Sequence, residues 1–272
     1  MDLSLLADIA IAAARAAGII IQEHLKEDIK VLEKQGGSSR AAQVLTKVDL
    51  ECEAIILAHL SPTCTKYDLA LLTEETEDDG SRFIKEFFWC VDPMDGTLAF
   101  IKKKPGFSVS IALVSKTGTP QIGVVHDPST DTTYHAIRGK GAFKNARPWK
   151  ITRKNDYFTY VTDKKLSETP GKTEISSLLN EFKGQVLTKV EEKAGGGAVL
   201  NAIRVLEHGP ACMLKLPKKE QGGGSLWDYA ATACIYQELG LPATDFAGRP
   251  LDLNKKGGTF MNEKGVFYAN FF

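Results

Sequence analysis

The sequence predicts a mixed α and β protein in which an α+β half is followed by an α/β half. An amphipathic pattern fills the first 25 residues, and runs rich in β-branched residues dominate the middle of the chain. Strand and helix signals then alternate, which is typical of βα units. A soft boundary near residue 155 divides the 272 residues into an N-terminal α+β half, 1–155, and a C-terminal α/β half, 156–272.

The composition is that of a soluble globular protein with no bulk charge. Apolar residues make up 43% and charged residues 25%, and 34 basic side chains balance 34 acidic ones. We therefore expect no nucleic acid polymer as a partner. Five cysteines without a Cys-x-x-Cys pair indicate reduced thiols, a cytoplasmic location and no zinc site. Neither a signal peptide nor a membrane span is expected, because Arg15 interrupts the apolar N-terminal stretch.

The N-terminal half begins with the amphipathic helix and continues with a second helix and a series of strands. Residues 36–39 (Gly-Gly-Ser-Ser) predict a loop. The second helix is expected from about Asp49, a favourable capping residue, to Leu60, because Ser61-Pro62 is a typical helix end. Strands are expected at Phe87–Val91, Phe107–Val114, Ile122–Val125 and Thr133–Ile137.

The C-terminal half shows alternating strand and helix signals. Its last helix is the strongest, and Gly240 closes it. Strands are expected at Phe158–Val161, Val186–Val190, Cys212–Leu216 and Val266–Phe271, and helices at Glu174–Phe182, Ala198–Glu207 and Trp227–Leu239.

The most informative stretch is the acidic turn Asp92-Pro-Met-Asp-Gly-Thr97, which follows a buried strand. The strand is expected to deliver Asp92 to its carboxyl edge, where ligand sites of open α/β sheets lie. Because Gly96 permits a sharp turn, Asp92 and Asp95 can face one cavity. If Gly96 and Thr97 open a short helix, their amides point toward an anion. Alone, the stretch is also compatible with a solvated turn.

Three further short motifs flank this turn: Thr46-x-x-Asp49, Glu74-Glu75 and Trp227-Asp228. Each alone is weak, since an acidic run such as the one around Glu74 is more often a solvated loop. Combined with the acidic turn, in this order and over nearly the whole chain, they resemble the inositol monophosphatase superfamily of Mg²⁺-dependent, lithium-sensitive phosphomonoesterases. The resemblance implies a layered α-β-α-β-α sandwich fold.

The resemblance implies hydrolysis of a small phosphorylated metabolite by metal-activated water, with two or three Mg²⁺ ions per site. Electrostatic repulsion between the acidic residues also favours bound metal ions. Two carboxylates about 5 Å apart repel by about 3 kcal/mol at an effective dielectric constant of 20. Hard divalent cations remove that repulsion. By resemblance, the metal ligands are Glu74, Asp92, the Met94 carbonyl, Asp95 and Asp228, the water-activating residues are Glu74, Thr97 and Asp49, and the substrate-binding residues include Asp95, Gly96, Thr97 and Asp228.

Other residues suggest which ester is cleaved. The Phe100-Ile-Lys102 continuation and the segment Asp245–Asp252 resemble bacterial 3′(2′),5′-bisphosphate nucleotidases. These enzymes remove the 3′-phosphate of 3′-phosphoadenosine 5′-phosphate, which is the substrate that we predict first. Lys215, Lys218 and Lys219 cluster before the last helix, and we expect Lys218 to bind the second phosphate. A solvated basic loop is the alternative for these lysines.

Other functions stay open at this point. The chain is alternatively an inositol monophosphatase or another sugar-phosphate phosphatase, or a relative that binds a phosphorylated metabolite without turnover. Homodimers are common among relatives, so a homodimer is a further expectation. Several positions depart from the family pattern and bear on the substrate rather than on the chemistry: Thr73, Leu98, Ala99, the loop Ala194–Gly197, and Gln221.

Overall fold

The structure is a computed structural model that describes residues 1–26, 31–33, 44–151, 156–184 and 189–271. In chain order its elements are α1 (Leu3–His24), β1 (Val31–Glu33), β2 (Val44–Thr46), α2 (Lys47–Tyr67), β3 (Ala70–Thr73), β4 (Phe87–Asp95), α3 (Thr97–Ile101), β5 (Ser108–Ser115), β6 (Pro120–Asp127), β7 (Thr132–Ile137), β8 (Gly141–Lys144), β9 (Arg147–Pro148), β10 (Phe158–Thr162), α4 (Lys172–Lys183), β11 (Val190–Ala194), α5 (Ala198–Glu207), β12 (Ala211–Lys215), α6 (Leu226–Glu238), β13 (Ala243–Thr244) and β14 (Val266–Asn270).

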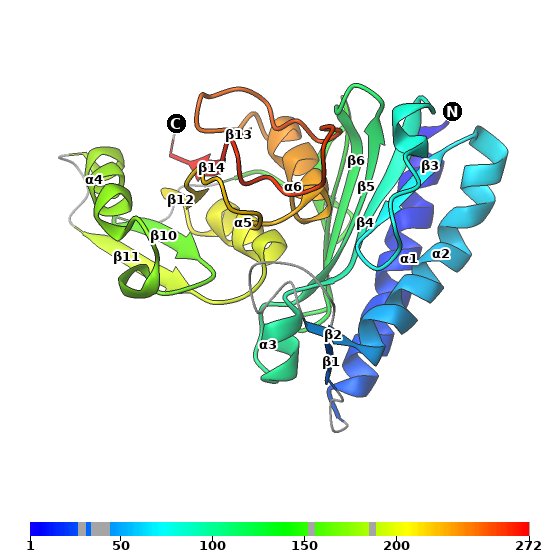
Figure 1. The fold of residues 1–272 in the computed structure, drawn as a ribbon, viewed down its shortest axis with the longest axis horizontal. Coiled ribbons are helices and arrows are strands. Elements are labelled where there is room, and N and C mark those ends of the chain that lie inside the picture. Colours follow the sequence, from blue (N-terminus) through cyan, green and yellow to red (C-terminus); the bar gives the residue numbers. More distant parts are fainter. Residues whose placement is uncertain (27–30, 34–43, 152–155, 185–188, 272) are drawn as a thin grey trace.

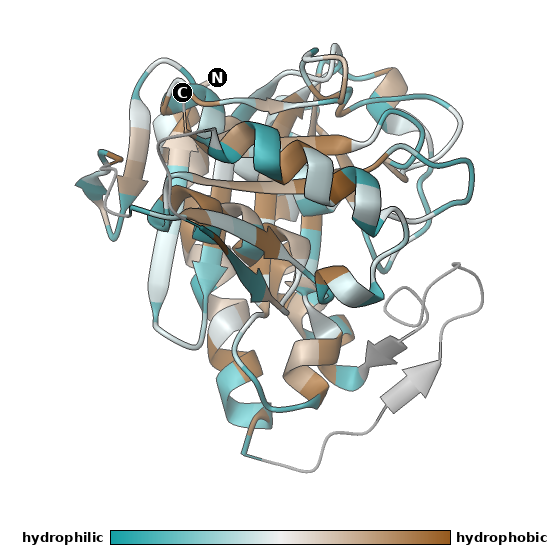
Figure 2. Cartoon of the chain, turned by 90° about the vertical axis from the view of Figure 1, so that its left-hand side faces the viewer, coloured by the Kyte–Doolittle hydropathy of each residue, from teal (hydrophilic) through white to brown (hydrophobic). Residues whose placement is uncertain are grey.

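Five layers succeed one another across the molecule (Figure 1). Helices α1 and α2 cover the outer face of a seven-stranded sheet, and α5 and α6 lie between that sheet and a five-stranded sheet, whose far side α4 covers. Apolar residues concentrate in the strands and on the helix faces turned toward them (Figure 2). The layered α-β-α-β-α sandwich predicted by resemblance is confirmed.

The two sheets differ in the direction of their strands. The seven-stranded sheet runs in the order β3-β4-β5-β6-β7-β8-β9, and every neighbouring pair except β3 and β4 is antiparallel. Asp92 lies near the carboxyl end of β4, as expected, but the sheet around it is mostly antiparallel and is not an open parallel α/β sheet. The five-stranded sheet, in the order β11-β10-β12-β14-β13, pairs β10 in parallel with β11 and β12. This sheet has the α/β alternation expected of the C-terminal half.

Helix α1 is the only described helix long and apolar enough by composition to cross a membrane. Its face with Leu6, Ala13 and Ala17 is fully buried and packs with α2 and the seven-stranded sheet. The close approach depends on Gly18, since a methyl group there would lie 2.5 Å from the ring of His126 on β6. The helix therefore forms the outer layer of the fold, as its amphipathic pattern predicts.

Helix α2 is longer than the sequence predicts. It begins at Lys47, so Asp49 lies in its first turn and is not the capping residue, and it continues through Pro62 to Tyr67. A proline removes one backbone donor, but packing in the following turn offsets this loss. The Thr63 hydroxyl is buried, donates to the Leu60 carbonyl and accepts from the Trp89 indole at 2.9 Å.

The remaining differences concern short strands and segment ends. Strand β4 extends four residues beyond the predicted end at Val91, through Pro93 to Asp95. Strands β3, β8, β9 and β13 have two to four residues and are not predicted from the sequence. The predicted strand Val186–Val190 falls partly outside the described residues, and β11 shares only Val190 with it and continues to Ala194. The predicted loop at 36–39 and the soft boundary near 155 also lie outside the described residues.

Helix α6 joins the two halves, because it belongs to the C-terminal half yet packs on β5, β6 and β7 of the first sheet. Its contact with β6 requires a residue without a side chain. A methyl group on Gly123 would lie 2.2 Å from the Ala231 carbonyl oxygen. Since that atom belongs to the helix backbone, the helix itself would have to move.

We expect Gly123→Ala to lower the free energy of unfolding by about 1–3 kcal/mol, because the added methyl group overpacks the contact between strand and helix. Thermal unfolding measures the change, at about 2–4 °C for each kcal/mol in a chain of this size. Ser177→Ala is the control, since Ser177 is exposed on helix α4, where alanine fits the backbone conformation. An unchanged midpoint for Gly123→Ala would contradict the packing account.

Candidate active site

A β-bulge near the end of β4 brings Asp92 and Asp95 to one side of the sheet. Asp92 pairs with Ser110 of β5 and Asp95 pairs with Ser108, so three steps along β4 match two along β5. In a regular strand, residues three apart face opposite sides, and one inserted residue reverses that relation. Pro93 lies inside the bulge, where the ladder needs no amide donor.

The N-terminus of α6 brings Asp228 to the same place. The Asp228 carboxylate accepts a hydrogen bond from the backbone amide of Ser225, which fixes its direction at the start of the helix. The Ser110 hydroxyl donates to the Trp227 carbonyl at 3.0 Å and so ties this helix end to the strand beside Asp92. Hydrogen bonds between side chains and the backbone thereby hold together residues that are far apart in the sequence.

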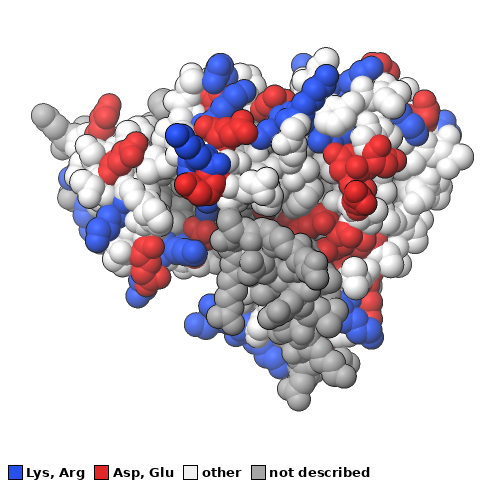
Figure 3. Space-filling model, viewed as in Figure 1, with Lys and Arg blue, Asp and Glu red and all other residues white. Residues whose placement is uncertain are grey.

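Asp92, Asp95 and Asp228 form an acidic cluster in which one oxygen of each carboxylate lies within 4.8 Å of the other two. Figure 3 shows acidic side chains gathered near the centre of the face drawn there. Burial raises the pKa of Asp92 and of Asp95 well above the usual value, and neighbouring acidic charges raise them further. Burial and the charge of Glu74 raise the pKa of Asp228 to about 7.

Glu74 lies beside this cluster, directly after β3. Its backbone amide donates to the Val91 carbonyl, which places it next to Asp92 across the β3–β4 pair. Its charge is the largest acidic influence on the pKa values of both Asp92 and Asp228. Glu74 therefore lies near the three aspartates, although only Asp92, Asp95 and Asp228 have carboxylate oxygens within 4.8 Å of one another among the described residues.

Thr97 and Asp49 are also brought together. The Thr97 hydroxyl lies 3.2 Å from Asp49 Oδ1 and 3.2 Å from the Met94 carbonyl oxygen. Gly96, at φ 85°, precedes the short helix α3 that Thr97 opens, so the predicted short helix after the acidic turn is present. This arrangement leaves the amides of Gly96 and Thr97 at the start of a helix beside the acidic cluster.

Asp95 is bound directly by helix α5. Its two carboxylate oxygens accept from the backbone amides of Ala198 at 3.1 Å and Val199 at 2.9 Å. These are unpaired donors of the first helical turn, and the helix dipole favours a negative charge there. They lower the pKa of Asp95 against the larger effect of burial.

Glycines allow three backbone segments to meet behind Asp95. The Gly197 amide donates to the Gly106 carbonyl at 2.8 Å. A methyl group on Gly96 would lie 2.3 Å from that carbonyl oxygen, and one on Gly106 would lie 2.6 Å from the Cα atom of Gly196. The loop that departs from the family pattern therefore approaches the acidic turn more closely than side chains would allow.

The sequence analysis missed Glu53, which is buried in α2 one turn after Asp49. Its carboxylate accepts hydrogen bonds from the hydroxyls of Thr73 and Thr76, the residues that flank Glu74 and Glu75. Glu53 therefore supports the segment that carries Glu74. The four-residue spacing from Asp49 places both acids on one helix face and was the available signal.

The lysines before α6 separate into two environments. Lys218 is exposed on the loop, whose backbone is held by Asn262, and no described contact links its side chain to the acidic cluster. Lys215 lies at the end of β12 and forms an ion pair with Asp163, with 2.8 Å between Nζ and Oδ1. Its charge lowers the pKa of Asp228, which places it near the cluster.

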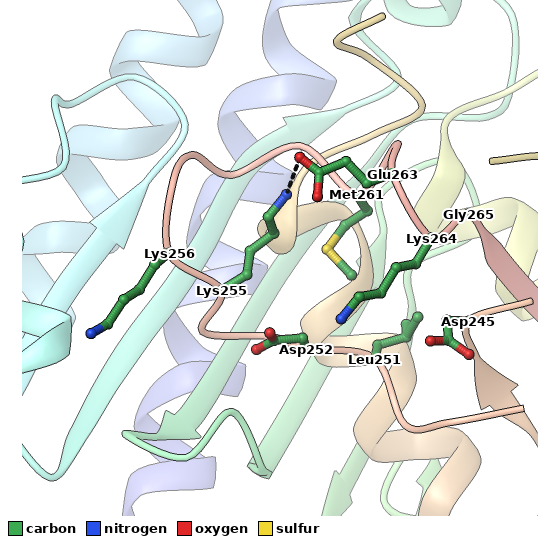
Figure 4. Close-up of a pocket in the computed structure, with 9 residues that line it drawn as sticks. All are labelled: Asp245, Leu251, Asp252, Lys255, Lys256, Met261, Glu263, Lys264 and Gly265. Carbon is green, nitrogen blue, oxygen red and sulfur yellow. Dashed lines mark ion pairs between the residues drawn. The ribbon is translucent and has the colours of Figure 1, made fainter. Parts of the chain in front are cut away.

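A cavity of about 220 Å³ lies elsewhere, among residues 245–265 (Figure 4). Its lining includes both Lys255 and Glu263, whose charged atoms lie 3.8 Å apart, and Asp245, which pairs with Arg249 at 2.9 Å. Because acids and bases in this lining compensate one another and none of the acidic cluster is among them, the cavity is distinct from the candidate site.

The sequence was compared with known protein families and with curated proteins. The profile of the inositol monophosphatase family matches residues 2–270. The chain belongs to the inositol monophosphatase family. Inositol monophosphatase 2 of Solanum lycopersicum is 30% identical over 254 residues, which are 92% of this chain and 90% of that protein.

Solved structures of family members share the fold. The extragenic suppressor protein suhB of Bartonella henselae has a TM-score of 0.73 at 25% identity, covering 98% of this chain and 94% of that one. SaIMPase-II of Staphylococcus aureus with inositol monophosphate bound has a TM-score of 0.69 at 24% identity, covering 97% and 89%. The same protein with 2′-AMP bound has a TM-score of 0.71 at 23% identity, covering 98% and 90%.

The residues present suit the divalent metal typical of inositol monophosphatases. Within the described residues, no basic side chain forms an ion pair with Asp92, Asp95 or Asp228. Two carboxylates at 4.8 Å repel by about 3 kcal/mol at an effective dielectric constant of 20. Carboxylate and carbonyl oxygens are the ligands that Mg²⁺ accepts, so this donor set fits the ion.

We expect Mg²⁺ to stabilise the protein more at pH 7.5 than at pH 5. The folded pKa values of the three aspartates exceed their unfolded values of about 4, so the metal-free folded state binds more protons than the unfolded state. Its free energy of unfolding therefore falls as the pH rises from about 4 toward 7. Bound Mg²⁺ restores this lost stability only at pH values at which the three aspartates are ionised.

Thermal unfolding with and without MgCl₂ at both pH values measures the effect, with NaCl of equal ionic strength as the control. Equal stabilisation by Mg²⁺ at the two pH values would contradict the assignment of these acids to a metal site.

Proposed function

We propose that this chain is a Mg²⁺-dependent phosphomonoesterase whose metal ligands are Glu74, Asp92, the Met94 carbonyl, Asp95 and Asp228. The observation that carries the proposal is the acidic cluster, in which buried carboxylates meet without a basic partner among the described residues. Such a cluster repels a phosphate until cations neutralise it. Membership of the inositol monophosphatase family and its metal-dependent phosphatases supports this chemistry.

In this proposal, different residues of the chain orient the water molecule and bind the phosphoryl group. Bound divalent cations supply positive charge for phosphoryl oxygens and lower the pKa of a water molecule. Thr97, whose hydroxyl lies 3.2 Å from Asp49, orients that water together with Glu74, and Asp49 accepts from the threonine hydroxyl. The amides of Gly96 and Thr97, at the start of α3, hold phosphoryl oxygens. No residue of the chain is phosphorylated in this scheme.

Two substrate classes have specific support. Inositol monophosphate is supported by the curated relatives and by the ligand of SaIMPase-II, whose 2′-AMP complex extends the class to ribose phosphates. The Phe100-Ile-Lys102 motif and the lysines of the loop before α6 support 3′-phosphoadenosine 5′-phosphate. In the second case exposed Lys218 binds the other phosphate. We place the inositol ester first, because the full-length comparisons favour it over the short motif.

We expect Asp95→Asn to lower kcat by more than about a hundredfold, because the amide removes a charge that holds the metal. Phosphate release with saturating Mg²⁺ measures this loss, and circular dichroism verifies that the variant is folded. Asp127→Asn is the matched control, since Asp127 is the last residue of β6 and its carboxylate accepts from the Ser129 amide in the following turn. Activity of Asp95→Asn close to that of the unaltered protein would remove Asp95 from the site.

The substrate is tested by the ratio of kcat/KM for inositol 1-phosphate and 3′-phosphoadenosine 5′-phosphate. We expect the inositol ester to be preferred. A preference of more than about tenfold for the nucleotide, equal to about 1.4 kcal/mol, would instead establish the second candidate. In that case Lys218→Met raises KM for the bisphosphate, while Lys172→Met, on the exposed start of α4, leaves it unchanged.

A further inference from the structure

The loop before α5 has no side chain of its own to fix its conformation. Three consecutive glycines, Gly195–Gly197, lie between Ala194 and Ala198 and are called the glycine loop below. Gly195 has φ 109° and Gly196 has φ 90°, so both lie in the left-handed region that favours glycine. Because glycine loses more conformational entropy on ordering than any other residue, contacts from outside the glycine loop must hold it.

Arg204, in the second turn of α5, makes such contacts. Its Nη1 atom donates to the Gly195 carbonyl oxygen at 2.6 Å and to Asn201 Oδ1 at 2.9 Å. The Asn201 side chain, in a residue that is 1% exposed, donates in turn to the Gly196 carbonyl oxygen at 3.4 Å. A hydrogen bond from a charged donor is roughly twice as strong as a neutral one. Side chains of α5 therefore bind the loop that precedes the helix.

The guanidinium group also packs between the glycine loop and the segment before β5. A methyl group on Gly196 would lie 2.9 Å from Arg204 Nη1, and one on Gly106 would lie 3.5 Å from Arg204 Nη2. The two backbone segments themselves approach so closely that a methyl group on Gly106 would lie 2.6 Å from the Gly196 Cα atom. Arg204 therefore contacts both segments at the point where they meet.

The glycine loop connects Arg204 to Asp95. Directly after Gly197, the amides of Ala198 and Val199 donate to the Asp95 carboxylate at 3.1 and 2.9 Å. The first turn of a helix frays easily, so these donors depend on the segment that precedes them. Within the described part of the chain, Arg204 forms no hydrogen bond with Asp95 itself. Any effect of Arg204 on this acid therefore passes through the glycine loop.

We propose that Arg204 is a positioning residue that holds the glycine loop in the conformation in which the first turn of α5 binds Asp95. Asp95 is thereby oriented for a divalent cation before the cation binds. The proposal deepens the proposed phosphomonoesterase function and rests on it for the role of Asp95 as a metal ligand. The contact between Arg204 and the loop belongs to the metal-free protein, so it can be tested without turnover.

Hydrogen exchange in the metal-free protein tests the effect on the loop. Arg204→Met removes the guanidinium donors, so we expect the amides of residues 195–199 to exchange at least about tenfold faster. The amides of α6, Leu226–Glu238, stay within about twofold of their rates in the unaltered protein, because α6 does not depend on this contact. Arg147→Met is the matched control, since Arg147 is exposed on β9, and it leaves both segments unchanged.

Isothermal titration calorimetry tests the consequence for the metal site. We expect Arg204→Met to raise the Kd for Mg²⁺ by about tenfold, because part of the binding free energy must then order the glycine loop. With saturating Mg²⁺, kcat for inositol 1-phosphate stays within about threefold, since Arg204 acts before the metal binds. Arg204→Lys recovers most of the Mg²⁺ affinity, because a single nitrogen makes both hydrogen bonds and an ammonium group has three donors.

Unchanged exchange of residues 195–199 in Arg204→Met would overturn the proposal, as would faster exchange with an unchanged Kd for Mg²⁺. A loss of kcat at saturating Mg²⁺ with an unchanged Kd would also overturn it, because Arg204 would then act on the substrate. If Arg204→Met does not fold, Arg204→Gln, which keeps a polar side chain without the charge, takes its place.

Failure of the proposed function gives a different result. The unaltered protein would then release no phosphate from any ester, while the exchange and calorimetry measurements would still decide whether Arg204 holds the glycine loop and supports Mg²⁺ binding.

Discussion

The mutual repulsion of buried carboxylates is the constraint around which this structure is organised. Asp92 and Asp95 have 1% and 5% of their surfaces exposed, and one oxygen of each lies within 4.8 Å of an Asp228 oxygen. A folded protein tolerates such a group only when fixed dipoles, protons or cations compensate it. The amides of α5 compensate Asp95, and the Ser225 amide compensates Asp228. In the proposed function a divalent cation neutralises the remaining charge.

Holding these acids together requires long-range contacts rather than a local motif. The bulge in β4 turns Asp92 and Asp95 to one side, and the Ser110 hydroxyl fixes the α6 terminus beside them. Gly123 lets α6 approach β6, and Gly106 lets the loop before α5 approach the acidic turn. Each of these features fixes the position of a backbone segment. The site therefore depends on the close contact between the two halves of the chain.

Sequence patterns predicted the parts of the site that depend on local chemistry. The turn from Asp92 to Thr97 contains its own strand end, glycine and helix start, so its geometry follows from neighbouring residues. The extent of α2 did not follow, because burial of Thr63 against Trp89 overrides the usual effect of Pro62. The support of Glu53 for Thr73 was also not apparent, since that contact joins elements twenty residues apart. Short strands such as β3 carry too few residues for a period to be detected.

The first and the second sheet contribute different parts of the candidate site. The acidic turn and Glu74 come from the first sheet, and in the proposed function they hold the metal. The loop Ala194–Gly197, which departs from the family pattern, begins at the end of β11 in the second sheet and leads to the α5 amides that bind Asp95. In the proposed function, this departure alters substrate choice while the metal-binding acids stay in place, because Arg204 and Gly106 contact the loop through its backbone.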